Sequence, residues 1–484
     1  MNLRIISKLL GLIIIFIGLS MIPACAWGFY YREKEAVLSI LLSMVIILAL
    51  GGLLTFLGRG SAKRLYRKEA IAIVGSAWLI GAALGGLPFY LSGTLPAYID
   101  SFFEAMSGFA TSGSTVLQEI ESTPKSILFW RSFTHWLGGM GIIVLFVAVL
   151  PFLGVGGREL FKREFSSATA QDLKPRIKDT AGILWKIYIT LSIIEVSVLL
   201  ACGMSFFDAL CHTFGSMGTG GFSTKTLSIG HYNSVAIELI IMLFMILAGT
   251  NFTLYFQLLR GRRKSLFNDP EWRVYISLLA ISILFVSTTL LLSGTYPTIR
   301  SSLRYGSFQV VSIMTCTGFT TANFDNWPYV CKLLLILLMF VGGCSGSTSG
   351  GIKVIRISIL FKSIMAHIAR VINPKQVRRV TVGSILIDEE LQKIAFGFFG
   401  LYIFIFCVAS FIMTLLGVDI ITSVSSVAAT LNMVGPGLGG VSPARDFASL
   451  PQAGKLLLSF CMAIGRLELF SILAFFTPYF WRRT

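Results

Sequence analysis

The segment Ala110-Thr111-Ser112-Gly113-Ser114-Thr115 sets a pattern that three later segments repeat: Thr219-Gly220-Gly221-Phe222-Ser223-Thr224, Thr317-Gly318-Phe319-Thr320-Thr321 and Val434-Gly435-Pro436-Gly437. A short apolar stretch precedes each one. The first two leads, Ser101-Phe102-Phe103-Glu104-Ala105 and Ser205-Phe206-Phe207-Asp208-Ala209, are near copies. Matching Gly113, Gly220, Gly318 and Gly435 gives spacings of 107, 98 and 117 residues. A period of roughly one hundred residues predicts a fourfold tandem repeat.

The composition places the chain in a membrane. Hydrophobic residues make up 55% of it, charged residues only 13%, and the mean hydropathy is +0.80, which lies outside the range of soluble proteins. The net charge of +17 does not indicate a nucleic-acid partner, because the basic residues gather between apolar runs instead of alternating with aromatics. We therefore expect an all-α polytopic membrane protein that contacts lipid and no nucleic acid.

Ten apolar runs are candidates for transmembrane helices, near residues 9–30, 37–57, 70–92, 127–154, 181–204, 234–258, 274–293, 329–372, 391–416 and 454–480. Clusters of arginine and lysine follow every even-numbered run. Because cytoplasmic loops carry an excess of these residues, the pattern predicts that both termini lie in the cytoplasm.

The four glycine segments lie on the outer side, each between an odd-numbered run and the next. Their leads are too short to cross a bilayer, so each must enter and return, which is tolerable only where the backbone lines a water-filled cavity. Four such re-entrant loops around one axis would form a pore whose backbone carbonyls replace the hydration shell of an ion. The short helices would aim their partly negative C-terminal ends at the cavity, which favours a cation.

The expected organisation is a helix–pore loop–helix unit used four times with pseudo-symmetry. A two-helix extension covers residues 1–69, and the repeats cover 70–160, 161–265, 266–380 and 381–484. The third repeat contains an interruption, Gly342-Gly343-Cys344-Ser345-Gly346-Ser347-Thr348-Ser349-Gly350-Gly351-Ile352-Lys353. So many small or polar residues inside an apolar run cannot continue a lipid-facing helix, so the helix must break. A loop at this depth is either a gate below the pore or a hinge.

These loops resemble those of the Trk/Ktr/HKT superfamily of cation transporters, and the likeness covers essentially the whole chain. The two helices before the first repeat and the Gly342–Lys353 run point to its TrkH branch. The resemblance implies potassium uptake through a homodimer in the bacterial inner membrane, controlled by a cytosolic TrkA-type nucleotide-binding ring. It implies potassium at the filter only and no organic cofactor in this chain. The first loop reads Thr-Ser-Gly where many relatives read Thr-Thr-Gly; since carbonyls would coordinate the ion, its identity should not change.

The candidate functional residues fall into two groups. The expected selectivity filter consists of Thr111, Ser112, Gly113, Thr219, Gly220, Gly221, Thr317, Gly318, Phe319, Val434, Gly435 and Pro436. The expected gate consists of Gly343, Ser345, Gly346, Ser347, Gly350 and Arg466.

Arg466 lies near the middle of the last apolar run, where a charge costs at least ~2.5 kcal/mol and so faces a cavity or a partner. Residues two apart do not share a helix face, which argues against a pair with Glu468. The resemblance implies that this arginine faces the permeation path. Glu104 and Asp208 are expected to anchor the pore helices. His212 lacks other ligands at metal-binding spacing. Glu195 and Lys186 have no assigned role.

Three alternatives remain. A potassium pore could also pass sodium, or couple uptake to another ion. A secondary transporter of another small solute would use an inverted two-part repeat instead of four loops of one orientation. An intramembrane enzyme would need a nucleophile and base or a metal constellation, which the sequence does not show.

Overall fold

The computed structural model is helical throughout most of the chain and describes residues 2–60, 67–149, 177–262, 264–373, 379–383 and 385–467. Within these residues six helices are long and apolar enough to cross a membrane, or seven if α11 (Val235–Ala248) and α12 (Phe252–Leu259) form one bent span. Two of the ten runs expected from the sequence, 127–154 and 454–480, extend beyond the described residues. The described residues form a helical bundle with several helices of membrane-spanning length.

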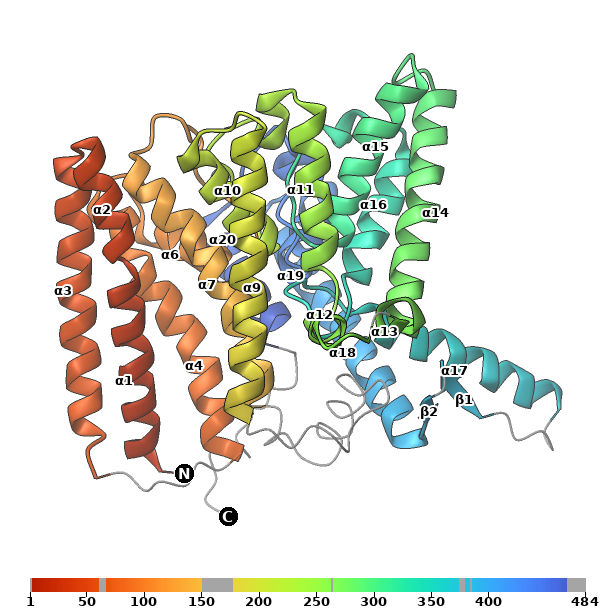
Figure 1. The fold of residues 1–484 in the computed structure, drawn as a ribbon, viewed down its shortest axis with the longest axis horizontal. Coiled ribbons are helices and arrows are strands. Elements are labelled where there is room, and N and C mark those ends of the chain that lie inside the picture. Colours follow the sequence, from red (N-terminus) through yellow and green to blue (C-terminus); the bar gives the residue numbers. More distant parts are fainter. Residues whose placement is uncertain are drawn as a thin grey trace.

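The N-terminal helices lie together at one side of the bundle (Figure 1). They are α1 (Leu3–Ser20), α2 (Ile22–Tyr31) and α3 (Lys34–Leu57). Small residues let α1 and α3 approach closely: a Cβ on Gly11 would lie 2.5 Å from Thr55 Oγ1. The Ser7 hydroxyl also donates to the Leu54 carbonyl at 2.8 Å. The extension is therefore packed by close backbone approach at its small residues together with buried isoleucines such as Ile14 and Ile47.

The rest of the chain presents the same order of elements four times: a long helix, a short buried helix, a loop and a further helix. The long helices are α4 (Arg67–Gly85) with α5 (Leu87–Leu91), α9 (Ile177–Ala201), α14 (Pro270–Leu292) and α18 (Glu389–Leu415). The short helices are α6 (Tyr98–Ala110), α10 (Phe206–Met217), α15 (Ile299–Met314) and α19 (Ile420–Leu431). The following helices are α7 (Lys125–Val149), α11 with α12, α16 (Tyr329–Val341) and α20 (Gln452–Arg466).

Side chains fix where the short helices begin. Ser205, Thr298 and Asp419 precede α10, α15 and α19, and each accepts a hydrogen bond from a backbone N–H of the first turn. Such caps satisfy donors that have no partner inside the helix. Short 3-10 helices follow three of the loops: η2 (Ser228–Tyr232), η3 (Phe324–Asn326) and η4 (Gly439–Val441).

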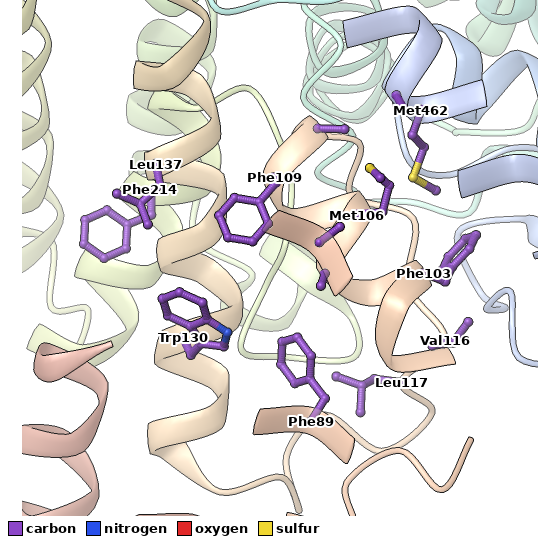
Figure 2. Packing of buried hydrophobic residues seen from close by; sticks show 14 of the residues in the cluster. Phe89, Phe103, Met106, Phe109, Val116, Leu117, Trp130, Leu137, Phe214 and Met462 are labelled. Carbon is purple, nitrogen blue, oxygen red and sulfur yellow. The ribbon is translucent and has the colours of Figure 1, made fainter. Parts of the chain in front are cut away.

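The core encloses the first short helix on all sides. Figure 2 shows Phe103, Met106 and Phe109 of α6 among side chains from α5, α7 and α20. Trp130 of α7 packs edge-on against Phe109 and donates its indole N–H to the Gly85 carbonyl at 2.9 Å. A helix that is buried all round and too short to span the bilayer is held by protein rather than by lipid.

The run 329–372 breaks where the sequence predicted. α16 ends at Val341, an irregular loop follows, and α17 (Val354–Ile372) then leaves the bundle (Figure 1). A hairpin of β1 (Val380–Val382) and β2 (Ile385–Ile387), which the sequence did not predict, packs beside α17. The second helix pair bends as well, by 92° between α11 and α12, and α13 (Lys264–Asn268) precedes α14.

Candidate ion pathway

All four short helices end in the same backbone geometry. The residue after the last turn has a positive φ: 57° at Thr111, 52° at Thr219, 57° at Cys316 and 57° at Met433. The next residue in each loop donates its N–H to a carbonyl five residues back, at 2.8, 2.7, 2.9 and 2.8 Å for Ser112, Gly220, Thr317 and Val434. This is a Schellman-type helix end, in which a left-handed residue reverses the chain.

A glycine in the left-handed region follows each of these ends. The φ angles are 79° at Gly113, 77° at Gly221, 81° at Gly318 and 97° at Gly435. The structure therefore corrects the register expected for the second loop: Gly221, not Gly220, is equivalent to the other three glycines. Gly220 instead takes the place of Ser112. Two consecutive glycines made the sequence match ambiguous by one residue, and only the φ angles resolve it.

The four loops close into a ring. A Cβ on Gly113 would lie 2.1 Å from the Gly220 carbonyl oxygen, and one on Gly221 would lie 2.0 Å from that of Thr317. In the same way, a Cβ on Gly318 would lie 1.8 Å from the Val434 carbonyl oxygen. Gly435 returns to the first loop, where its Cβ would lie 2.9 Å from the Ser112 oxygen. Each glycine thus accommodates a carbonyl of a neighbouring loop. The contacts run from the first loop through the second, third and fourth and back to the first, so the ring is closed.

The equivalent glycines also share a vestibule. Gly113, Gly221, Gly318 and Gly435 all line one open cavity of about 260 Å³. Thr320, Pro436, Arg445 and Asp446 line the same cavity. Phe319, in contrast, is buried behind the third loop, where the Ser312 hydroxyl donates to its carbonyl at 2.6 Å.

An acid bonded to the vestibule residue Thr226 has a lowered pKa. Glu121 accepts hydrogen bonds from the backbone N–H and the hydroxyl of Thr226, which lines the vestibule. Partial burial raises the pKa of the Glu121 carboxyl, but the bonds from Thr226 and the charge of Lys225 lower it, and the net pKa lies below its usual value. The carboxylate therefore remains negative at neutral pH next to the cavity residue Thr226.

Polar side chains behind the ring hold the strands that follow the glycines. Glu104, nine residues before Gly113, accepts from the Thr115 hydroxyl and the Val116 N–H, both at 2.9 Å. Arg131 forms a buried ion pair with Glu104 at 2.6 Å and donates to the Ser223 carbonyl of the second loop at 3.0 Å. The expected anchoring role of Glu104 is thus visible as a bridge between neighbouring loops.

The second repeat uses a different residue for this purpose. His212, nine residues before Gly221, lies 2.9 Å from the Ser223 hydroxyl through Nε2, and its Nδ1 lies 2.7 Å from the Asp208 carbonyl. Asp208 sits one turn earlier and binds the hydroxyls of Ser205 and Thr224. The Phe-Phe-acid leads therefore do not occupy equivalent positions. α6 and α10 begin at the same distance from Gly113 and Gly221, but Asp208 lies four residues earlier in this register than Glu104. In the third repeat, Gln309 accepts the Thr321 N–H at 2.8 Å when its amide oxygen faces the strand.

The irregular loop Gly342–Lys353 lies directly beneath the ring. Its Thr348 hydroxyl donates to the carbonyls of Met217 at 3.0 Å and Ala248 at 3.2 Å, and its Ser349 hydroxyl donates to the Thr315 carbonyl at 2.8 Å. A Cβ on Gly350 would lie 2.5 Å from the Asn432 oxygen. The loop therefore touches the C-terminal ends of α10, α15 and α19, one or two residues before the residues with positive φ.

Two buried cations hold this loop. Arg466 donates to the Thr348 carbonyl at 2.7 Å and to the Gly138 carbonyl of α7 at 2.9 Å. Lys353, which has a φ of 82°, donates its ammonium to the Ser349 carbonyl. Among the residues that the structure describes, Arg466 has no carboxylate partner, and Glu468 lies outside them. Two adjacent carbonyls of the loop are therefore each bound by a positive charge.

The other expected gate residues form the frame of the loop. The Ser345 N–H donates to Glu271 Oε1 at 2.7 Å, and the Gly343 N–H donates to the Ser349 hydroxyl at 3.0 Å. Gly346 accepts the Phe252 N–H at 3.2 Å, and the Ser347 hydroxyl bonds back to Cys344. Sequence reasoning missed Thr348, Ser349 and Lys353 as contact residues. The signal was present, because they were the remaining hydroxyls and the only lysine of the quoted run.

Glu195, which had no assigned role, is fully buried in α9 and accepts the Ser216 hydroxyl of α10 at 2.5 Å. It therefore ties a long helix to the second short helix one turn before Thr219. No contact is described for Lys186. No cluster of three or more histidine, cysteine or acidic side chains suited to a metal ion occurs in the described residues.

Known proteins resemble this chain over its full length. The sequence profile of the TrkH family, described as cation transport protein, matches residues 37–482. The Trk system potassium uptake protein TrkH of Halomonas elongata is 39% identical, and that of Escherichia coli strain K12 is 38% identical; all of each chain is covered. The crystal structure of the potassium transporter TrkH from Vibrio parahaemolyticus covers all of both chains with 36% identity and a TM-score of 0.92. The ring of four loops thus stands within a full-length match in sequence and in fold, and this chain belongs to the TrkH family of cation transport proteins.

Proposed function

We propose that this chain takes up potassium ions across a bacterial inner membrane, as the transport subunit of a Trk system. The observation that carries the proposal is the closed ring in which each positive-φ glycine meets a carbonyl of the next loop. Carbonyl oxygens at this density can replace the hydration shell of a cation. The names of the relatives, Trk system potassium uptake proteins, support potassium as the ion.

The selectivity filter consists of the loop residues from Thr111 to Gly113, Thr219 to Gly221, Thr317 to Gly318 and Val434 to Gly435. Its backbone does the coordinating, which explains why the side chains differ between loops. The short helices add a favourable field, because their C-terminal carbonyl ends converge beneath the ring. Potassium is the cargo, and the chain needs no organic cofactor for this task.

The loop Gly342–Lys353, together with Arg466, forms the gate. Thr348 and Ser349 donate to helix-end carbonyls that would otherwise face a permeating ion. Lys353 and Arg466 add two positive charges in a water-poor region, where repulsion of a cation is weakly screened. The docked loop therefore opposes flux by occupying acceptors and by charge, and conduction requires it to move.

The remaining parts of the proposal concern assembly and topology. The basic clusters between even and odd runs support a cytoplasmic location for both termini. We infer a homodimer and a cytosolic TrkA-type nucleotide-binding ring as partners. The name Trk system, carried by the relatives, supports further Trk components. Such a ring would bias the loop between docked and undocked positions.

A flux assay tests the function. Purified protein in liposomes should admit rubidium, a potassium surrogate, and discriminate against sodium, whereas an amino-acid panel should not be transported. The matched variants are Gly318→Ala, which places a Cβ 1.8 Å from the Val434 oxygen, and Gly294→Ala, which shares a positive φ but has open space around it. The first should lose ion preference and the second should retain it. Equal rubidium and sodium uptake by the parent would refute potassium selectivity.

A further inference from the structure

A second cavity lies away from the ion pathway, where α17, β1 and the first turns of α18 meet. Its volume is about 430 Å³. The residues that line it are Ser363, Ala366, His367, Arg370, Val380, Glu389, Gln392, Lys393 and Phe396. Figure 1 shows these elements together at the end of the bundle opposite α1 to α3. The filter and the gate use none of them.

A small core of its own supports this cavity. Ile359, Leu360 and Ala366 of α17 pack with Val380, Val382 and Ile387 of the hairpin and with Leu391 and Ala395 of α18. Two hydrogen bonds add to it: Lys362 Nζ donates to the Thr381 carbonyl at 2.7 Å, and Gln392 Nε2 donates to that of Ile387 at 3.1 Å. The walls of the cavity are therefore built by packed elements of secondary structure.

The lining is matched to an anion. Arg370 and Lys393 are cationic, His367 adds a ring nitrogen, and Glu389 is the one carboxylate among the lining residues. No hydrogen bond or ion pair within the described residues engages Arg370 or Lys393. The Ser363 hydroxyl lines the same space, is only 5% exposed, and has no hydrogen-bond partner among the described residues. A guanidinium fork, an ammonium and a hydroxyl donor are the groups that bind phosphate oxygens.

The depth of the cavity points to lipid. α18 begins at Glu389 and is apolar enough to cross the membrane, so its first turns lie at the membrane surface. Phe396, about one turn beyond Lys393, also lines the cavity and is 44% exposed. On α17, Ile364 and Ile368 are also exposed. Apolar side chains next to a basic pocket offer separate surfaces to acyl chains and to a headgroup.

We propose that this cavity binds the phosphate of an anionic phospholipid from the leaflet on the side of the basic loops. Arg370 and Lys393 would hold the phosphate oxygens, Ser363 would donate a hydrogen bond, and Phe396 would contact the acyl chain. Lipid clamps α17 to α18 in this arrangement. Since α17 directly continues the loop Gly342–Lys353, lipid in this cavity stabilises the segment that follows the gate.

Native mass spectrometry of the full protein in detergent tests the proposal. The probes are phosphatidylglycerol and phosphatidylcholine at equal acyl composition. The parent should retain phosphatidylglycerol preferentially. The double variant Arg370→Gln, Lys393→Gln should retain at least about tenfold less phosphatidylglycerol than the parent. Each basic residue near an anionic lipid surface strengthens lipid binding several-fold. The matched control Arg260→Gln, Lys264→Gln removes the same charge from basic residues outside the cavity and should bind like the parent.

Ser363→Ala keeps the fold while removing the buried hydroxyl, and it should weaken phosphatidylglycerol retention by a few-fold. Inorganic phosphate is the second arm, added in millimolar excess over the lipid. Failure of phosphate to displace the lipid supports a site that needs the acyl chain. Displacement by phosphate alone would assign the cavity to a free anion and overturn the proposal. Equal lipid retention by the parent and both double variants would overturn it as well.

Discussion

Arg466→Ala should open the pathway, because it removes the strongest contact that holds Thr348. The guanidinium donates to the Thr348 carbonyl at 2.7 Å, and it is fully surrounded by protein, with 3% of its surface exposed. A hydrogen bond from a charged donor contributes about 1.5–3 kcal/mol. Since 1.4 kcal/mol is a factor of ten, the ratio of undocked to docked loop should rise by roughly ten- to hundredfold. Loss of a fixed positive charge from the pathway acts in the same direction.

The assay is rubidium uptake into liposomes that contain equal amounts of folded, monodisperse protein. Arg304→Ala is the matched control. It also removes a guanidinium, one that pairs with Glu238 at 2.6 Å, but it touches neither the ring nor the loop. Its uptake should equal that of the parent, whereas Arg466→Ala should take up rubidium faster.

Arg466→Lys separates the two contributions. If the charge dominates, a lysine should keep flux near the parent level, and if the fork between Thr348 and Gly138 dominates, it should behave like alanine. Parent-level uptake by Arg466→Ala, with folded protein present, would refute the role of this arginine in closing the pathway. If Arg466→Ala abolishes folded protein, and a second substitution that neutralises a nearby acid restores it, then Arg466 is half of a structural ion pair.

Three other predictions concern the ring, the loop and the support behind them. Gly113→Ser places a Cβ 2.1 Å from the Gly220 oxygen, so bi-ionic reversal potentials should show a lower preference for potassium over sodium; Gly93→Ser, with a φ of 71° and open space, should leave it unchanged. Deletion of residues 346–350 should raise basal rubidium flux, because the shortened loop cannot reach the helix ends, and an unchanged flux would make the segment a hinge. Glu104→Gln leaves the buried Arg131 without a carboxylate partner, which should lower the free energy of unfolding by about 3 kcal/mol and with it the midpoint of thermal unfolding. A midpoint equal to that of the parent would show that the buried pair does not stabilise the fold.

The sequence was most informative about the repeat. The four loops and the break after α16 follow from composition and spacing, because membranes exclude irregular backbone except at cavities. The charge at Arg466 signalled contact with a cavity or partner for a similar reason. These inferences depend on the solvent that surrounds the chain, and they need no knowledge of which residues touch.

The sequence could not establish the register of the second loop or the role of His212. The equivalence of Gly221 with Gly113 depends on φ angles, and tandem glycines at 220 and 221 carry no signal that separates them. His212 was considered only as a metal ligand, whereas its place nine residues before the ring glycine makes it a support. The repeated leads caused this, because Glu104 is the seventh residue of α6 whereas Asp208 is the third residue of α10, so matching the two acids misaligns the helices by four residues.

The degeneracy of the loop sequences follows from what the ring requires. Each loop must supply a left-handed residue, a carbonyl and a glycine, and only the glycine is restricted by the close approach of its neighbour. Met433 and Cys316 can therefore stand where the first two loops have threonine. The hydrogen bonds that support each loop differ as well. The fourth loop has no acid at the position of Glu104. Instead, the Ser425 hydroxyl donates to the Leu438 carbonyl at 2.9 Å, and the Gly437 N–H donates to the Val441 carbonyl at 2.7 Å. Because the loops meet through backbone atoms, each repeat can change its side chains independently without breaking the ring, and the glycines are what remain for a sequence comparison to find.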